Sequence, residues 1–414
     1  MKILLMVCSF PPEISAGHLE YQLSQALTEA GHDVSIVTAF PRRYLLNHAQ
    51  KHAGKFSYTE KMDNKLQVRK MGPEFSNRDN LVSRGLEYFV DFVIFGLGGL
   101  VSKKSNVILC SSPPMTIGLA GWVLARIRRV PIILRVGDIH PQALIDLGLV
   151  KNRTFICILR IMENLLYRKV DHIIVLSETY KRDLINKGVN PQKVTIVPNW
   201  SDVKEPSPQD QEKADHFRKK NGLSADFLVT YAGIMSWPQD LETVVESASL
   251  LVDHSDIKFL LVGDGPQRGT LENKIKNLGL RNVVFLPLQP RDVYLNILRA
   301  SDVCLVSLKR DYKAPAVPSK LIDIMACGKP VIANVPFEGD VPKIIKIADC
   351  GLWVEPQKPQ DFSQAVLNLY NEQNVRQNKG KKARKYFESH YSLESCMRRY
   401  EEIFFSEVKN NTRA

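Results

Sequence analysis

Three polar residues stand at the start of a predicted helix in "PAVPSKLIDIMACGKPVIAN", residues 315–334. Ser319 is a candidate N-cap, and the unpaired N–H groups and dipole of a helix start favour a bound anion. Lys320 adds a full positive charge, and Asp323 falls on the same helix face as Ser319. Beside a phosphate, such a carboxylate can accept hydrogen bonds from ribose hydroxyls. The segment predicts a phosphate and ribose site, although by itself it also fits an ordinary capped helix.

A second polar group follows a candidate strand in "RVGDIHPQ", residues 135–142. Arg135, Asp138 and His140 crowd the end of that strand, where charged groups make poor core residues. An aspartate or histidine after a strand is also a common turn or helix-cap residue. The pattern favours a binding site at this strand end.

Glycines follow two further candidate strands. Gly17 lies in the loop of "CSFPPEISAGHLE", residues 8–20, and Gly263 and Gly265 flank Asp264 in "LLVGDGP", residues 260–266. Glycine lets the backbone turn tightly and approach a ligand closely, although either loop also fits a plain turn. Neither loop is a dinucleotide-binding Gly-x-Gly-x-x-Gly motif or a P-loop.

Short apolar runs alternate with helical patterns along the chain. The runs are continuous in Val, Ile and Leu, which indicates parallel strands buried on both faces. The predicted strands are 2–7, 33–40, 106–111, 131–137 and 172–177, then 227–233, 257–265, 283–288, 302–308 and 329–334. The predicted helices are 19–30, 114–127, 155–168, 179–187, 241–251, 268–278, 292–299 and 320–326. This order predicts two doubly wound α/β domains, which bind ligands beyond the carboxyl ends of their strands.

The two series of strands are separated by 197–213, a stretch rich in Pro, Ser and charge that is typical of a linker. We therefore expect an N-terminal domain over 1–198 and a C-terminal domain over 199–390. The remaining segment, 391–414, contains an amphipathic helix over 392–408 that we expect to pack back on the N-terminal domain.

Composition is that of an ordinary folded protein. The chain has 414 residues, a net charge of +12 and seven scattered cysteines, with no Cys-x-x-Cys pair. The cysteine pattern favours a reducing compartment, and the charge suits anionic substrates or an anionic membrane surface. The apolar run at the N-terminus is short for a signal peptide, lacks a cleavage site and fits a buried first strand better. No stacking motif or basic stripe indicates nucleic-acid binding.

Together these stretches resemble glycosyltransferase family 4. "CSFPPEISAGHLEYQLSQALTEAGHDVSIVT" resembles the N-terminal signature of the family, and "RVGDIHPQALIDLG" resembles the "RDLWPESL" segment of a subgroup that includes bacterial fucosamine, O-antigen and capsule transferases. "IVPNW", "GIMSWPQDLETVVESASLL", "LVGDGPQRGTLENKIKNLGLRNVVFLPL" and "PAVPSKLIDIMACGKPVIAN" match the C-terminal half in order and spacing. The resemblance covers nearly the whole chain.

The resemblance implies the GT-B fold, two Rossmann-like domains with a cleft between them. It implies retaining transfer of a hexosyl or N-acetylhexosaminyl group from a nucleotide diphosphate-sugar, expected to be a UDP-sugar, to an acceptor hydroxyl. No metal or other cofactor is expected. The implied donor-binding residues are Gly233, Gln239, Gly263, Gly265, Pro287, Leu288, Val317, Ser319, Lys320, Leu321 and Asp323. Glu13, Ala16, Gly17 and Arg135 are expected on the acceptor side, and Asp138, His140 and Lys320 are the candidate catalytic residues.

The chain departs from the family pattern at informative positions. The family's Glu-x7-Glu motif places its second acid at Asp323, but its first acid falls at Pro315, so donor-sugar recognition must differ. The family's Arg and Lys pair for the diphosphate is absent from "GIMSWPQDL", which leaves Lys320 as the best candidate to neutralise phosphate charge. The subgroup's tryptophan and glutamate are replaced by His140 and Gln142.

The acceptor is expected to be a polyprenyl-diphosphate-linked glycan of cell-surface polysaccharide biosynthesis, reached from the cytoplasmic face of the membrane. The segment 77–104 has a long apolar run, 86–101, between Arg78, Arg84 and Lys103-Lys104. Such a helix suits a membrane interface, and a buried core helix remains the alternative. Two other functions also remain open, a non-catalytic or regulatory nucleotide-sugar-binding protein and a sugar-nucleotide epimerase of the same fold.

Overall fold

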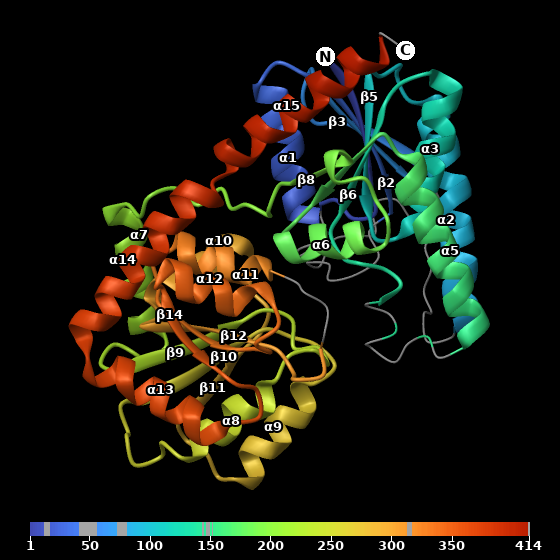
Figure 1. Cartoon of the computed structure of the whole chain (residues 1–414). Helices are drawn as coiled ribbons and strands as arrows, with labels where there is room; N and C mark the ends of the chain where they lie inside the picture. Colours follow the sequence, from blue (N-terminus) through green and yellow to red (C-terminus); the bar gives the residue numbers. More distant parts are fainter. Residues whose placement is uncertain are drawn as a thin grey trace. The chain divides into compact units, whose positions relative to one another are not determined.

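The computed structural model describes residues 1–11, 17–40, 56–72, 81–142, 145, 150, 152–312 and 317–412, with side chains from residue 89 onward in the segment that begins at 81. The chain divides into two compact units. Unit 1 is Met1–Pro198 together with Leu393–Ala414, and unit 2 is Asn199–Ser392. Each unit is a sheet with helices on both faces, so the predicted α/β class is confirmed (Figure 1).

Unit 1 contains an eight-stranded sheet in the order β3-β4-β2-β1-β5-β6-β7-β8. The strands are β1 Lys2–Val7, β2 Asp33–Ala39, β3 Ser57–Lys61, β4 Leu66–Met71, β5 Val107–Ser112, β6 Ile132–Val136, β7 His172–Val175 and β8 Val194–Ile196. All neighbours pair in parallel except β3 with β4. The inner strands are buried along almost their whole length, which explains their continuous apolar runs.

The helices of unit 1 cover both faces of this sheet. They are α1 Gly17–Glu29, α2 Leu81–Val101, α3 Met115–Arg128, α5 Arg153–Lys169, α6 Glu178–Asn186 and α15 Leu393–Asn411. Helices α2, α3 and α5 lie on one face, and α1 and α15 lie on the other (Figure 1). The C-terminal helix α15 buries Tyr400 and Phe404 and contacts α1 and β5, so it is part of unit 1.

Unit 2 contains a six-stranded parallel sheet in the order β11-β10-β9-β12-β13-β14. Its strands are β9 Phe227–Ala232, β10 Ile257–Val262, β11 Val283–Leu286, β12 Val303–Ser307, β13 Val331–Asn334 and β14 Gly351–Val354. Its helices are α7 Pro208–Lys220, α8 Leu241–Ser249, α9 Arg268–Asn277, α10 Arg291–Ala300, α11 Ser319–Ala326, α12 Asp340–Ala348, α13 Pro359–Asn371 and α14 Gln373–His390. One core packs α10, α11, α12 and α14 on the sheet, and a second packs α8, α9 and α13 on the opposite face.

Three details differ from the sequence-based expectations. Strands β3, β4, β8 and β14 and helices α12, α13 and α14 were not predicted. The end of the proposed linker, 208–213, is the first part of helix α7, which begins with a capping box between Ser207 and Asp210. The assignment of Ser319 as an N-cap is wrong, because α11 already includes Ser319 and the extended cap residue is Pro318.

Candidate functional site

Strand-end loops of unit 2 cross one another so closely that only glycine fits at the crossings. A Cβ on Gly263, which follows β10, would lie 1.9 Å from the carbonyl oxygen of Gly233, which follows β9. A Cβ on Gly265 would lie 2.5 Å from the carbonyl oxygen of Met235. All three glycines have positive φ values, 146° at Gly233, 152° at Gly263 and 148° at Gly265. The predicted glycines therefore build a compact backbone surface at the carboxyl ends of the strands.

Lys320 reaches this glycine surface from the first turn of α11. Its Nζ donates to the Tyr231 hydroxyl at 2.8 Å and to Gln239 Oε1 at 3.2 Å, and it lies 4.1 Å from the centre of the Tyr231 ring. A Cβ placed on Gly233 would be 3.1 Å from the same Nζ. Three of the predicted donor-binding residues, Gly233, Gln239 and Lys320, therefore meet in one place.

The partners of Lys320 among the described residues are neutral. Among the described residues no carboxylate forms an ion pair with it, and its partners are neutral oxygens and an aromatic face. Burial lowers the pKa of Lys320 to about 7, because desolvation disfavours the ammonium form. A polyanion that arrives here would supply the missing charge, so the arrangement suits a phosphate group.

Asp323 lies in a buried cluster, with 8% of its surface exposed. The guanidinium of Arg291, at the start of α10, donates to Oδ2 and to Oδ1, each at 3.2 Å, and the Ser201 hydroxyl donates to Oδ1 at 2.7 Å. Arg291 also donates to Asp202 Oδ1 at 2.8 Å. Burial works to lower the pKa of Arg291, but Asp323 and Asp202 raise it overall. Both oxygens of Asp323 thus already accept hydrogen bonds, and its predicted contact with ribose stays a prediction.

The other predicted donor residues occupy varied surroundings. Val317 and Leu321 are buried in the core of unit 2, where they hold α11 in place. Pro287 is exposed just after β11, and its carbonyl accepts from Gln289 Nε2 at 3.0 Å. Leu288 is half-buried and Ser319 is exposed. Pro315 lies outside the described residues.

In unit 1, Asp138 follows β6 and is half-buried. Burial raises its pKa to about 6, while the Tyr180 hydroxyl, 3.5 Å from Oδ1, and the nearby Arg135 work in the opposite direction. Burial lowers the pKa of His140 to about 4, so its ring is neutral near pH 7. A carboxylate with this pKa is ionised near neutrality and is still basic enough to accept a proton from a hydroxyl.

Arg135 points into the interior of unit 1. It is 5% exposed, and its Nη1 lies 2.8 Å from Oε1 of Glu20 on α1, which also accepts from the Ser111 hydroxyl at 2.9 Å. Burial alone would lower the pKa of Arg135, but Glu20 and then Tyr400 raise it overall. This ion pair fixes α1 at the end of β6, and the acceptor-side role of Arg135 stays a prediction.

Gly17 begins α1 against the backbone of the first strand-end loop. A Cβ here would lie 2.7 Å from the Cα of Phe10, so no other residue fits without a shift. Glu13 and Ala16, the other predicted acceptor-side positions, lie outside the described residues.

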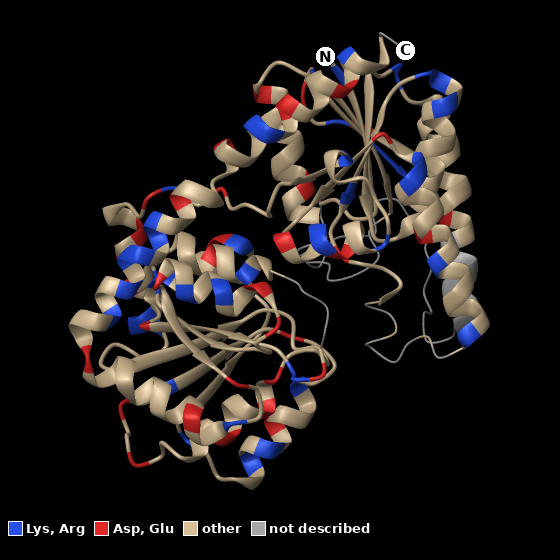
Figure 2. Ribbon diagram, in the orientation of Figure 1, with Lys and Arg blue, Asp and Glu red and all other residues tan. Residues whose placement is uncertain are grey.

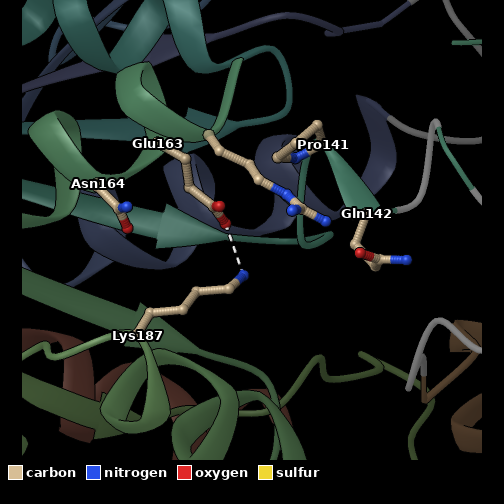
Figure 3. A pocket seen from close by; sticks show the side chains of 6 residues that line it. Pro141, Gln142, Glu163, Asn164 and Lys187 are labelled. Carbon is tan, nitrogen blue, oxygen red and sulfur yellow. Dashed lines mark hydrogen bonds and ion pairs between the residues drawn. The ribbon is translucent and has the colours of Figure 1, made fainter. Parts of the chain in front are cut away.

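A polar pocket of about 260 Å³ lies next to the loop that carries Asp138 and His140 (Figure 3). The loop provides Pro141 and Gln142 to its wall, α5 provides Arg160, Glu163 and Asn164, and Lys187 closes it from the end of α6. The Lys187 Nζ lies 2.9 Å from Glu163 Oε1 and 2.7 Å from Asp183 Oδ2. Burial raises the pKa of Glu163, and Lys187 opposes that shift. The pocket can hold a polar group such as a sugar.

Sequence reasoning missed Glu20, Arg291, Arg160 and Lys187. Each lies within a helix or at its end, and the ion-pair partners Arg135 of Glu20 and Asp323 of Arg291 are far away in the sequence, so no local motif indicates these residues. The only sequence signal was that charged residues such as Glu20 fall on the apolar, core-facing side of a helix.

Two family models match the chain, one in each half. Residues 20–200 match the glycosyl transferase 4-like domain, and residues 213–386 match glycosyl transferases group 1. The chain therefore belongs to the glycosyltransferases of family 4, as its resemblance implied, and it is a glycosyltransferase.

Similar proteins agree with this family. A protein of Escherichia coli strain K12 named as a glycosyl transferase of colanic acid biosynthesis, WcaI, is 26% identical over 336 residues, which cover 79% of this chain and 82% of WcaI. The N,N'-diacetylbacillosaminyl-diphospho-undecaprenol alpha-1,3-N-acetylgalactosaminyltransferase of Campylobacter jejuni is 24% identical over 297 residues, 68% of this chain and 73% of that enzyme. The crystal structure of Anabaena HepE in complex with UDP superposes with a TM-score of 0.72 at 16% identity, and covers 98% of this chain and 100% of HepE. The GT-B fold predicted from the sequence is thereby confirmed.

Proposed function

We propose that this glycosyltransferase moves a hexosyl or N-acetylhexosaminyl group from a UDP-sugar to a hydroxyl of a lipid-linked glycan in cell-surface polysaccharide biosynthesis. The observation that carries the proposal is the Lys320 amine, held on the glycine surface of unit 2 by neutral partners. The UDP in the HepE structure, the colanic acid role in the name of WcaI and the undecaprenol-linked acceptor of the Campylobacter enzyme support the donor and acceptor classes.

The proposed reaction breaks the bond between the anomeric carbon of the sugar and the diphosphate oxygen, and UDP leaves with the bonding electron pair. The new bond joins the anomeric carbon to the acceptor oxygen with retention of configuration, and the acceptor proton passes to Asp138. Charge therefore grows on the leaving diphosphate, where Lys320 and the N–H groups at the start of α11 stabilise it. No metal is required for this step.

Nucleotide release tests the proposal. The purified protein is incubated with UDP-, GDP- and dTDP-sugars, with and without an extract of lipid-linked glycans, in buffer that contains EDTA. We expect release of UDP that depends on the acceptor, persists with EDTA and falls strongly in Lys320→Ala. Wild-type turnover by Lys320→Ala would contradict the phosphate role. Binding without turnover would favour a regulatory protein, and an epimerised nucleotide-sugar would favour an epimerase.

We also propose that the enzyme acts at the cytoplasmic surface of a membrane, where a polyprenyl-linked acceptor resides. Within the described part of the chain, no helix has both the length and the apolar character needed to cross a bilayer. Action at the membrane would thus use a surface contact, and the apolar helix α2 motivates the proposal.

A further inference from the structure

Helix α2 presents an apolar side to the outside of unit 1. Phe89, Val93, Leu97, Leu100 and Val101 are 65%, 40%, 47%, 50% and 60% exposed. Their spacing places Phe89, Val93, Leu97 and Leu100 along one stripe of the helix. The opposite side packs on the sheet, so α2 is a core helix whose outer side is also apolar.

The apolar surface continues over the two neighbouring helices. Helix α3 packs against both α2 and α5, and Figure 1 shows the three in one layer on the sheet. A shallow groove between α2 and α3 is lined by apolar side chains from both helices. The exposed apolar residues of α3 and α5 are Val123, Ile127, Phe155, Ile158, Ile161 and Leu165. We call these residues, with the exposed residues of α2, the three-helix face.

The exposed charged residues among the described side chains of α2, α3 and α5 are all basic. Exposed basic residues on or next to the helices are Lys103, Lys104, Arg126, Arg129, Arg153, Arg160, Arg168 and Lys169. Among the described side chains of α2, α3 and α5, the acidic ones are Asp91 and Glu163, and both are buried, at 1% and 2% exposure. Asp171, which follows α5, is half-buried and lies 3.9 Å from Arg126. Figure 2 shows blue segments along these helices, together with red segments where their acidic residues lie.

This combination identifies the kind of partner. Soluble proteins rarely leave so many contiguous large apolar side chains in water. A protein partner could cover them, but a border of basic residues, with no exposed acid among the described side chains of the helices, matches anionic phosphates above a hydrocarbon layer.

We propose that the three-helix face docks unit 1 on a bilayer that contains anionic lipids. The apolar side chains enter the boundary between headgroups and acyl chains, and the flanking lysines and arginines contact the phosphates. This inference rests on the proposed action at a membrane. It specifies the surface of the protein that binds and the anionic lipids that this surface prefers.

Vesicle flotation tests the surface without donor or acceptor. Wild-type protein is mixed with vesicles of phosphatidylcholine alone or with added phosphatidylglycerol. The double variant Leu97→Asp/Ile161→Asp removes apolar contacts and adds repulsion, so its partition should fall by about tenfold or more. The matched control is Ile347→Asp, at a 72% exposed residue on α12 of unit 2, and it should bind like wild type.

A second pair of variants tests the charges. Lys103→Glu/Lys104→Glu should lose binding to vesicles that contain phosphatidylglycerol, whereas Lys381→Glu/Lys385→Glu, exposed on α14 of unit 2, makes the same charge change and should bind normally. Leu97→Trp, which retains an apolar side chain, should gain fluorescence quenching by brominated lipids, and Ile347→Trp should not.

The outcomes separate this inference from the proposed function. If wild-type protein binds no vesicle, both the action at a membrane and the three-helix face are overturned. If it binds but the three-helix variants match their controls, the membrane role stands and the face is wrong. If light scattering shows a dimer that Leu97→Asp/Ile161→Asp dissociates, the face is a subunit contact and the inference fails. Release of nucleotide from the UDP-, GDP- and dTDP-sugars is measured without vesicles, so it tests the proposed transferase activity separately from membrane binding.

Discussion

Lys320 is the residue whose protonation should control donor binding. Its pKa of about 7 in the free protein is expected to rise when a diphosphate binds beside it. When UDP binds above pH 7, the neutral amine of Lys320 takes up a proton, so the affinity for UDP should fall by up to about tenfold per pH unit as the pH rises above 7. Calorimetry in buffers of different ionisation enthalpy would detect the proton.

The control for this prediction is Lys320→Met, which keeps the length of the side chain but not its charge. Its affinity for UDP should be low and nearly independent of pH above about 7, where Lys320 would otherwise titrate, since no group replaces the ammonium. A pH dependence that survives in Lys320→Met would assign the proton to another group.

The ionisation of Asp138 should control how kcat/KM rises with pH on the acidic side of the pH profile. As a base it must be ionised, so kcat/KM should rise with pH through about 6, the pKa that burial gives this carboxyl. Tyr180→Phe removes the hydroxyl that lowers this pKa. The rise of kcat/KM should therefore move to higher pH, while its maximum value at higher pH is retained. Asp138→Asn should lose about a hundredfold or more in kcat. An unchanged rise in Tyr180→Phe would show that Asp138 is not the titrating group.

At the scale of elements, the crossing of the β9 and β10 loops should be intolerant of any side chain. Gly263→Ala places a methyl group 1.9 Å from a backbone oxygen, so we expect the free energy of unfolding of unit 2 to fall by about 2–3 kcal/mol. We expect the affinity for the donor to fall as well. Gly279→Ala is the control, since its φ of 64° is also positive but no atom lies within 4 Å of the added Cβ. It should cost about 1 kcal/mol. If urea denaturation shows that Gly263→Ala and Gly279→Ala lose equal stability, the clash with the backbone oxygen is not the cause.

The link between α10 and α11 should depend on the Arg291 guanidinium. Arg291→Ala leaves the buried Asp323 without its cation, so unfolding should require about 3 kcal/mol less even in the absence of nucleotide. Arg310→Ala breaks an exposed pair with Glu355 and should change stability by under about 1 kcal/mol. If Arg291→Ala is stable and only UDP affinity falls, Asp323 serves the ligand and not the fold.

The sequence predicted elements whose signal is local. The runs "KILLMV" and "FLVTYA" are buried inner strands that their mostly apolar sequences predict, and Gly263 was selected because a strand followed by Gly-x-Gly needs a tight turn. The edge strand β3, "SYTEK", was missed because it is polar and depends on antiparallel pairing with β4. Pairs such as Arg135–Glu20 and Arg291–Asp323 join distant parts of the chain, so spacing could not reveal that these charges are already neutralised.

At the scale of the whole molecule, catalysis and docking should be separable because they use different residues. Leu97→Asp/Ile161→Asp changes the outer side of unit 1 and leaves Lys320 and Asp138 intact, so kcat with a water-soluble acceptor analogue should match wild type. With the same glycan on a polyprenyl diphosphate in anionic vesicles, kcat/KM should fall by about tenfold, since the enzyme no longer concentrates at the surface. High salt should reproduce part of this loss in wild type because it screens the contacts of basic residues with lipid phosphates. Equal losses with both acceptors would mean that the three-helix face supports the fold of the active enzyme and does not act as a membrane anchor.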